Sequence, residues 1–276
     1  MTDILADKRE RAIRILATHE TLLIALSGGV DSAVLLALAV EAIGPEYVIA
    51  ATGVSPSLAR SDLEDARSVA ARLGVRHLES PTREFELPAY RANTGDRCYH
   101  CRSELFRVLG AMADQLGGAT LAYGAIQGDL PESRPGMRAA TESGVLAPLL
   151  AAGIRKEEVR ELARAFGLDV QDKPAAACLA SRIPVGVAVE APVLRQVERA
   201  EAGLRALGFS QVRVRHHGPL ARIELDLDGL ARVTAPDVRR EICRVLHRSG
   251  FRFVTVDLEG YRGSGATDAL PHDAEA

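Results

Sequence analysis

Tryptophan is absent from this chain of 276 residues, and lysine and cysteine are scarce. Lysine occurs only at Lys8, Lys156 and Lys173, and arginine supplies the remaining basic residues. Four cysteines are too few for a disulfide scaffold in a chain of this length. The longest apolar run, residues 33–40, is far shorter than the roughly 18 residues that suggest a membrane span. These absences predict a cytoplasmic protein that has no membrane partner.

Acidic and basic residues nearly balance, with 34 Lys and Arg against 37 Asp and Glu and a net charge of −3. General nucleic-acid binders carry a marked basic excess, so no nucleic-acid partner is expected, although a local basic site remains open. The charged N-terminus has a helical pattern and does not resemble a secretory signal. A chain of this length can bury a substantial core in one large or two modest domains.

Short apolar runs alternate with helical patterns over the first 170 residues. This alternation predicts a parallel sheet covered by helices on both faces. After about residue 180 the order becomes helix, two strands joined at Gly218 and Pro219, helix and strand, which predicts a small α+β domain. We therefore expect an α/β fold with a first domain over 1–178, a second over 179–262 and a disordered tail over 263–276.

A glycine-rich turn, Leu-Ser-Gly-Gly-Val-Asp-Ser at residues 26–32, lies between an expected strand and an expected helix. Glycines permit positive φ and let backbone N–H groups approach an anion, and the helix start adds its own N–H groups. Asp31 could bind magnesium. The alternative is a tight turn in which Asp31 or Ser32 caps the helix. The turn matches neither the Walker A pattern nor Gly-x-Gly-x-x-Gly.

Three of the four cysteines lie in motifs that invite a chemical interpretation. Cys98 and Cys101 form a C-x-x-C just before an expected helix, Cys178 follows 77 residues later, and Cys243 is expected to be a core residue. The residues alone allow a redox pair, a zinc site completed by His100, an iron–sulfur cluster on three thiolates, or unrelated thiols.

The segment Val-Arg-Val-Arg at residues 212–215 reads as a strand whose two arginines point to one face. Two such guanidinium groups can bind a phosphate through paired charge-assisted hydrogen bonds. The following strand places acidic residues on one face, so the alternative is a lattice of cross-strand ion pairs. The strand pattern alone favours the lattice.

Residues 27–32 match, position for position, the Ser-Gly-Gly-x-Asp-Ser pattern of the PP-loop, and the chain therefore resembles the ATP pyrophosphatases. Members of that superfamily cleave ATP between the α and β phosphates and adenylate an oxygen of the substrate. The resemblance implies that five loop residues bind the departing pyrophosphate: Ser27, Gly28, Gly29, Asp31 and Ser32. It also implies that Gly53, Val54, Ser55 and Gly124 border the adenosine.

Several further motifs resemble the LarE family of ATP-dependent sulfur transferases, which act in nickel-pincer nucleotide cofactor synthesis. They are Lys-Pro-Ala-Ala-Ala-Cys-Leu-Ala-Ser-Arg-Ile-Pro-Val-Gly (173–186), Asn-Thr-Gly-Asp-Arg-Cys-Tyr-His-Cys-Arg (93–102), Arg-Pro-Gly-Met-Arg-Ala-Ala (134–140), Val-Arg-Val-Arg-His-His-Gly (212–218) and Leu-Glu-Gly-Tyr-Arg (258–262). The resemblance implies a homo-oligomeric enzyme that adenylates a carboxylate of pyridinium biscarboxylic acid mononucleotide and converts it to a thiocarboxylate.

Within that family the position matching Cys178 supplies the sulfur. Members with this cysteine alone give up its own sulfur, whereas members with three cysteines hold a 4Fe–4S cluster whose open iron carries the donated sulfide. Cys98, Cys101 and Cys178 place this chain with the second subgroup, with ATP, Mg²⁺ and the cluster as cofactors.

The resemblance also assigns Arg213 and Arg215 to the substrate phosphate, with Arg182 as a further candidate. Glu201 and Glu224 match acidic positions of the family's inter-subunit site and are candidate metal ligands. Lys173 either reaches a nucleotide phosphate or is solvated. The competing functions are a PP-loop tRNA thiolation enzyme and an ATP-binding regulatory module without chemistry.

Overall fold

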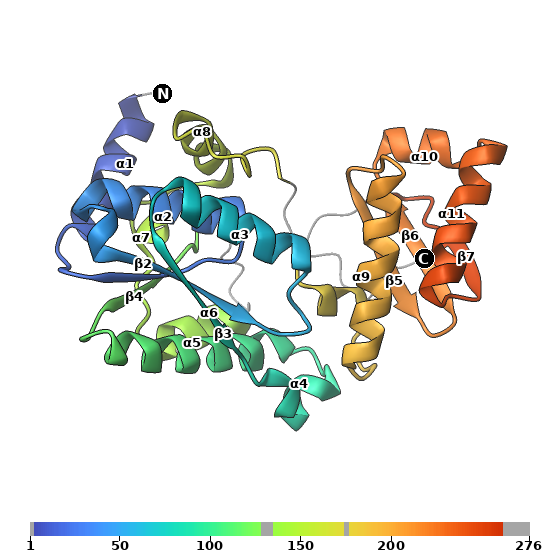
Figure 1. Cartoon of the computed structure of the whole chain (residues 1–276), viewed down its shortest axis with the longest axis horizontal. Coiled ribbons are helices and arrows are strands. Elements are labelled where there is room, and N and C mark those ends of the chain that lie inside the picture. The colour runs from blue at the N-terminus through green and yellow to red at the C-terminus, as the bar shows by residue number, and fades with distance from the viewer. Residues whose placement is uncertain (1–2, 128–134, 174–176, 262–276) are drawn as a thin grey trace, which may run out of the picture. The chain divides into compact units, whose positions relative to one another are not determined.

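The computed structural model describes residues 3–127, 135–173 and 177–261. They form two compact units, one of residues 1–90 with 96–173 and one of residues 91–95 with 174–276 (Figure 1). The tail expected over 263–276 lies outside the described residues. Within the described ranges, no helix is long and apolar enough to cross a membrane.

The first unit begins with a helix and then alternates strands with helices. Its helices are α1 (Asp3–Leu16), α2 (Val30–Ile43), α3 (Arg60–Arg72), α4 (Pro88–Ala92, which runs into the second unit), α5 (Arg97–Gln115), α6 (Pro135–Glu142), α7 (Pro148–Ala151) and α8 (Lys156–Ala165). Its strands are β1 (Leu22–Ala25), β2 (Val48–Val54), β3 (Arg76–Pro81) and β4 (Thr120–Tyr123), with short 3-10 helices at Pro45–Tyr47 and Glu84–Glu86.

The four strands form one parallel sheet in the order β3-β2-β1-β4. Figure 1 shows α2 and α3 on one face of the sheet and α5 on the other. Alternate residues of β1 reach both layers, because Leu22 and Ile24 join the core of α2 and α8 while Leu23 packs with Leu109 of α5. The order places β1 at the switch point of the sheet, where ligands bind beyond the carboxyl ends of the strands.

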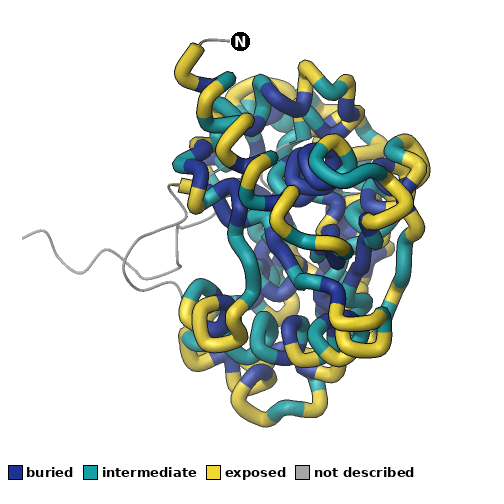
Figure 2. The backbone as a smooth tube through the Cα atoms, turned by 90° about the vertical axis from the view of Figure 1, so that its left-hand side faces the viewer, coloured by how far each residue is buried: buried dark blue, intermediate teal, exposed yellow. Residues whose placement is uncertain are grey.

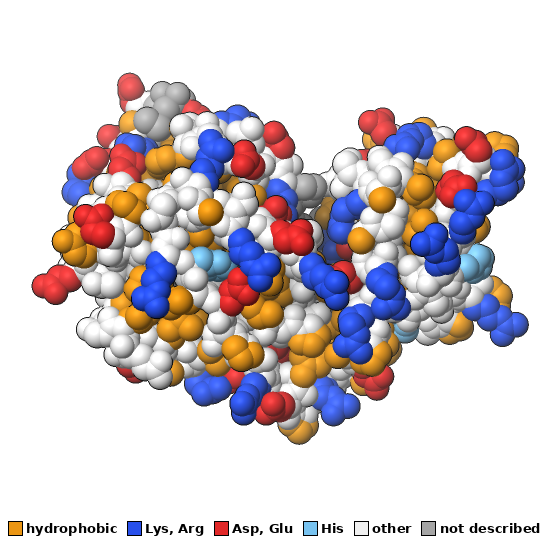
Figure 3. Space-filling view, in the orientation of Figure 1, with side chains coloured by type: hydrophobic (Ala, Val, Ile, Leu, Met, Phe, Trp, Pro, Cys, Tyr) orange, Lys and Arg blue, Asp and Glu red, His pale blue; other side chains and the backbone are white. Residues whose placement is uncertain are grey.

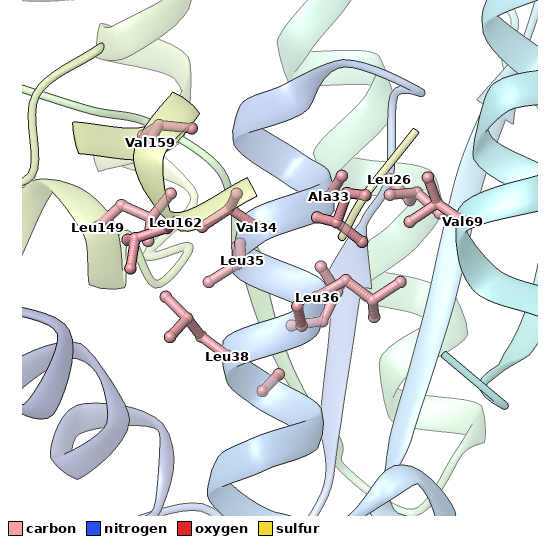
Figure 4. Packing of buried hydrophobic residues seen from close by; sticks show 14 of the residues in the cluster. Leu26, Ala33, Val34, Leu35, Leu36, Leu38, Val69, Leu149, Val159 and Leu162 are labelled. Atoms are coloured by element: carbon pink, nitrogen blue, oxygen red, sulfur yellow. The ribbon is translucent and has the colours of Figure 1, made fainter. Parts of the chain in front are cut away.

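Helix α2 is buried on almost every side, because its sequence is almost continuously apolar. In Figure 4, Leu149, Val159 and Leu162 approach it from one side, and Leu26 and Val69 lie on the other. Figure 2 shows that buried and exposed residues alternate along the helices. The start of α2, and the turn before it, therefore rest on a rigid support.

In its described residues, the second unit contains a smaller sheet and the helices α9, α10 and α11. Its elements are a 3-10 helix, η3 (Leu179–Arg182), α9 (Ala191–Ala206), β5 (Val212–His217), β6 (Leu220–Leu225), α10 (Leu227–Val233), α11 (Pro236–Ser249) and β7 (Phe253–Val256). Strand β6 is central, antiparallel to β5 and parallel to β7. The two sheets confirm the α/β class with an added small α+β part.

Two helices differ from the sequence expectation. Helix α5 begins at Arg97, so the C-x-x-C motif forms its first turn rather than preceding it. Helix α10 begins at Leu227, directly after β6, and is additional to the elements expected in this part of the chain. Asp226 causes this second change, because its carboxylate accepts a 2.8 Å hydrogen bond from the Gly229 N–H and caps the helix.

Candidate functional site

The glycine-rich turn joins the carboxyl end of β1 to the first residue of α2. Gly28 has φ of +73°, and a Cβ atom at this position would lie 1.9 Å from the carbonyl oxygen of Asp62. A side chain is therefore excluded both by the backbone conformation and by the neighbouring chain. Gly29 is the N-cap residue, and no side chain caps the helix, so the capping interpretation of Asp31 and Ser32 is wrong.

Two serine hydroxyls face each other across this turn. The hydroxyl oxygens of Ser27 and Ser32 lie 3.1 Å apart, and the Ser32 hydroxyl oxygen also accepts a hydrogen bond from the Ser27 N–H at 3.2 Å. The Ser32 hydroxyl donates in turn to the Gly29 carbonyl at 3.0 Å. A hydroxyl rotates freely enough to redirect its proton to an incoming anion. The turn thus combines backbone N–H groups, a helix N-terminus and two hydroxyls, which is the equipment of a phosphate site.

Neighbouring strands contribute two further close approaches. A Cβ atom on Gly124, just after β4, would lie 2.8 Å from the Ser32 backbone nitrogen, so Gly124 packs directly on the start of α2. Gly53 of β2 is small for another reason, because a Cβ there would lie 2.5 Å from Leu105 Cδ1. Val54 ends β2, and the Ser55 hydroxyl accepts the Ser57 N–H at 3.2 Å. The predicted contacts of these residues with adenosine remain predictions.

Two of the three lysines lie against the turn. The Lys156 ammonium donates to both carboxylate oxygens of Asp31, at 2.8 and 2.7 Å. The Lys173 ammonium donates to the Gly28 carbonyl at 2.9 Å and pairs with the carboxylates of Asp62, at 2.8 Å, and Asp65. The sequence motifs did not identify Lys156 as a site residue. The scarcity of lysine was the signal that could have pointed to it.

A buried hydrogen-bond chain supports the residue before the turn. The Thr52 hydroxyl donates to the Leu26 carbonyl at 2.6 Å, so the Nε2–H of His77, 2.7 Å away, donates to the Thr52 oxygen. Burial lowers the pKa of the His77 imidazole, and the nearby Glu79 only partly opposes this effect. His77 therefore supports the turn as a neutral ring near pH 7.

Cys98 and Cys101 lie one turn apart on α5 and so share one side of the helix. Cys98 is exposed and Cys101 is half-buried. The His100 ring lies between them in sequence but pairs with the Asp96 carboxylate at 3.1 Å, which weighs against His100 as the fourth zinc ligand. Across the described parts of the chain, which include all four cysteines, no disulfide forms and no ready cluster of three metal-binding side chains is present.

Cys178 is exposed and immediately precedes η3 in the second unit. The buried Arg182 turns back on it, and its Nη1 donates to the Cys178 carbonyl and the Ser181 hydroxyl, both at 3.0 Å. The same guanidinium donates from Nε and Nη2 to the two carboxylate oxygens of Glu201, at 2.8 and 3.0 Å. Arg182 therefore fixes the backbone beside Cys178 to helix α9.

Glu201 is the anchor of this arrangement. Besides Arg182, its carboxylate accepts from Arg205 at 2.9 Å and from the Val214 N–H at 3.1 Å. Burial alone would lower the pKa of Arg182, but the Glu201 carboxylate outweighs it and raises that pKa above the ordinary value. Arg182 and Glu201 form a buried ion pair, and removing either partner alone would leave an unpaired buried charge and destabilise the fold.

Strand β5, which carries Arg213 and Arg215, takes part in the ion-pair lattice that the strand pattern alone favoured. Arg215 donates to Glu224 at 2.8 Å and to the Ser181 carbonyl at 2.7 Å, and Arg222 pairs with the same Glu224 at 3.4 Å. Arg213 lies over the Tyr261 ring, with 4.5 Å from Cζ to the ring centroid. Burial, and then the positive charges of Arg182 and Arg215, lower the pKa of Arg213. An anion near Arg213 would relieve this charge repulsion.

The parallel sheet, the glycine turn after its central strand and the close approach of Gly124 define a PP-loop protein of the ATP-pyrophosphatase type. The NAD synthase family model matches residues 13–98, which include the turn. An uncharacterised protein of Synechocystis sp. is 40% identical over 259 residues, covering 94% of this chain and 96% of that protein. The pyridinium-3,5-bisthiocarboxylic acid mononucleotide synthase of Lactiplantibacillus plantarum is 33% identical over 267 residues, 96% of each chain.

This chain belongs to the LarE family of ATP-dependent sulfur transferases. Similarity over a smaller share of the two chains reaches the tRNA-specific 2-thiouridylase MnmA of Azorhizobium caulinodans, which is 34% identical over 231 residues, 71% of this chain but only 59% of that protein.

Proposed function

We propose that this enzyme adenylates a carboxylate of pyridinium-3,5-biscarboxylic acid mononucleotide with ATP and converts it to a thiocarboxylate. The observation that carries the proposal is the glycine turn, where Gly28 and Gly124 are each excluded from bearing a side chain beside the start of α2. The name of the Lactiplantibacillus plantarum relative supplies the product class, and its similarity covers 96% of both chains.

In the first step a carboxylate oxygen of the substrate attacks the α-phosphate of ATP, and pyrophosphate leaves with the electron pair of the broken P–O bond. Negative charge on the leaving group faces the N–H groups of the turn, the start of α2 and the hydroxyls of Ser27 and Ser32. Magnesium, with Asp31 as its candidate ligand, would neutralise further charge on the phosphates.

In the second step a sulfur nucleophile attacks the acyl carbon, and AMP leaves. A thiolate suits this step because it is nucleophilic near neutral pH. Cys178 is exposed, and Arg182 fixes the adjacent backbone. If Cys178 gives up its own sulfur, the thioester loses its Cα proton, the Cβ–S bond breaks, and dehydroalanine remains beside the thiocarboxylate product.

We propose instead that Cys98, Cys101 and Cys178 ligate a 4Fe–4S cluster. The donor set fits, since thiolates are the ligands of such clusters, Cys98 and Cys101 share one side of α5, and both Cys98 and Cys178 are exposed. When bound, a cluster with three protein ligands offers one open iron that can carry a transferable sulfide. The polypeptide would then survive each turnover.

Cys98→Ala is expected to remove the brown iron–sulfur absorption that the wild type acquires on anaerobic reconstitution with iron and sulfide, because two thiolates remain where three are needed. The absorbance of the visible iron–sulfur bands and the iron content per chain measure how much cluster is lost. Cys243→Ala is the matched control, since Cys243 is half-buried in α11, and it should retain the absorption. A colourless wild type, or an unchanged Cys98→Ala, would contradict the cluster.

For the substrate phosphate we propose Arg213 and Arg215. Arg215 also pairs with Glu224, and the further candidate Arg182 is held by its bonds to Glu201 and the Cys178 backbone. Arg213→Ala is expected to raise KM for the mononucleotide roughly 10- to 100-fold, the effect of losing a charged hydrogen bond, with KM for ATP unchanged. Steady-state kinetics with each substrate varied checks this. Arg244→Ala, an equal charge loss on the surface of α11, should change neither constant, and an equal loss for both substrates would contradict the assignment.

A tRNA substrate is less well supported. This chain spans only 59% of the length of the 2-thiouridylase it matches. On the face of the first unit shown in Figure 3, basic and acidic side chains are interspersed. Nucleic-acid binding draws its affinity from clustered positive charge. Filter retention of labelled tRNA by the purified protein would decide against the mononucleotide as the substrate.

The homo-oligomer, the cytoplasmic location and a metal-binding role of Glu201 and Glu224 stay predictions.

A further inference from the structure

Lys156 has no assigned role, yet it lies at the glycine-rich turn in a chain that has only three lysines. It is the first residue of α8 and is 125 positions away from its partner Asp31. Asp31 itself belongs to the first turn of α2. The lysine therefore places a positive charge beside the helix start at the glycine-rich turn.

The base of this side chain is rigid. Glu158 accepts the Arg155 N–H at 2.7 Å, which closes a capping arrangement around Lys156. The third lysine, Lys8, fixes the same Glu158 with bonds of 2.7 and 2.8 Å. One turn further along α8, Val159 packs into the core shared with α2 (Figure 4). Only the side chain of Lys156 needs to move for its ammonium to change partner.

Lys173 beside the same turn is different. An ammonium has three donors, and those of Lys173 meet three acceptors: the Gly28 carbonyl and the carboxylates of Asp62 and Asp65. Lys173 thus tethers the turn to α3. Lys156 directs both of its hydrogen bonds to a single carboxylate, and its side chain is 32% exposed. Its third N–H meets no acceptor among the residues that the structure describes.

We propose that Lys156 is a pyrophosphate-binding residue, which pairs with Asp31 in the resting enzyme and turns its ammonium to the β- and γ-phosphates when ATP enters the turn. Phosphate oxygens there would lie close to the Asp31 carboxylate, and the ammonium that already pairs with this carboxylate can offset the repulsion. A compact ammonium on a flexible stem suits a change of partner better than the rigid fork of arginine. The inference rests on the proposed use of ATP.

The test compares two ligands by isothermal titration calorimetry, inorganic pyrophosphate and AMP, each with magnesium present. Lys156→Gln is expected to weaken pyrophosphate binding roughly 10- to 100-fold, as for the loss of a charged hydrogen bond, and to leave AMP binding within about twofold. AMP lacks the two phosphates that Lys156 would contact. Arg244→Gln carries the same change in charge at a surface residue of α11 that pairs with Glu241, and it should bind both ligands like the wild type.

Equal pyrophosphate affinity in Lys156→Gln and the wild type would overturn the inference while ATP use stands. Equal loss of AMP and pyrophosphate, with a lowered melting temperature, would also overturn it, because the lysine would then be a structural residue. A wild type that binds neither AMP nor pyrophosphate would refute the proposed function itself, and this outcome is distinct from the other two.

Discussion

Cys178→Ser is expected to abolish thiocarboxylate formation while the enzyme still releases pyrophosphate from ATP. A serine hydroxyl is not ionised near pH 7 and does not ligate an iron–sulfur cluster as a thiolate does, so either route to the product is lost. Cys178 is exposed, and its backbone partner Arg182 is untouched, so stability should change by no more than about 0.5 kcal/mol. Product by mass spectrometry, pyrophosphate by a coupled assay and the melting temperature separate these effects.

The control for this experiment is Cys243→Ser, which changes a half-buried cysteine of α11 and should retain full transfer. Persistent thiocarboxylate formation in Cys178→Ser would remove Cys178 from the mechanism. Intact mass of the wild type after turnover then identifies the sulfur source. Loss of the elements of hydrogen sulfide means that Cys178 donated its own sulfur, and an unchanged polypeptide means that the sulfide came from elsewhere.

Gly28→Ala is expected to lower ATP affinity by at least about 100-fold. The added methyl group would lie 1.9 Å from the Asp62 carbonyl oxygen, which is backbone and cannot rotate away. The turn must therefore leave its position, and Lys173 loses the Gly28 carbonyl that it binds at 2.9 Å. An L-residue at φ of +73° adds a further cost of about 1–2 kcal/mol. Calorimetry with ATP and thermal unfolding measure the two effects.

Gly74→Ala is the matched control, because Gly74 has φ of +66° and a Cβ there meets nothing within 4 Å. It should lose the same 1–2 kcal/mol of stability, approximately, and bind ATP normally. The difference between the two variants isolates the contact with Asp62. Normal ATP binding by Gly28→Ala would show that the turn does not hold the nucleotide in this conformation.

Arg182 makes contacts in the fold that its position in the sequence did not suggest. Its place beside Cys178 in the sequence suggested a substrate contact. In the fold it is buried, with bonds to Glu201 and to the Cys178 carbonyl, so its charge is already neutralised. Its contribution to substrate binding stays a prediction, but its contribution to the shape of the Cys178 segment is visible.

The sequence by itself determined the features that depend on local order. The apolar run before the glycine-rich turn predicted a buried strand, the pattern after it predicted a helix, and the Ser-Gly-Gly-x-Asp-Ser match between them predicted a pyrophosphate-binding turn. The alternation of Arg213 and Arg215 with valines predicted a strand with both arginines on one face, and the acidic residues of the next strand made an ion-pair lattice the alternative to phosphate binding. Such patterns are readable because strand and helix periods repeat along the chain.

Only the tertiary structure decided which distant residues meet. Lys156 reaches Asp31 across 125 positions, Lys173 reaches Asp65 across 108, and the backbone of Asp62 is what makes Gly28 irreplaceable. Glu201 joins Arg182 to the Val214 N–H in the same way. No local pattern encodes these contacts, because they depend on how α8 and α3 pack beside α2 and how α9 packs on β5. The identity of the turn is therefore a property of the sequence, and the charges that surround it are a property of the fold.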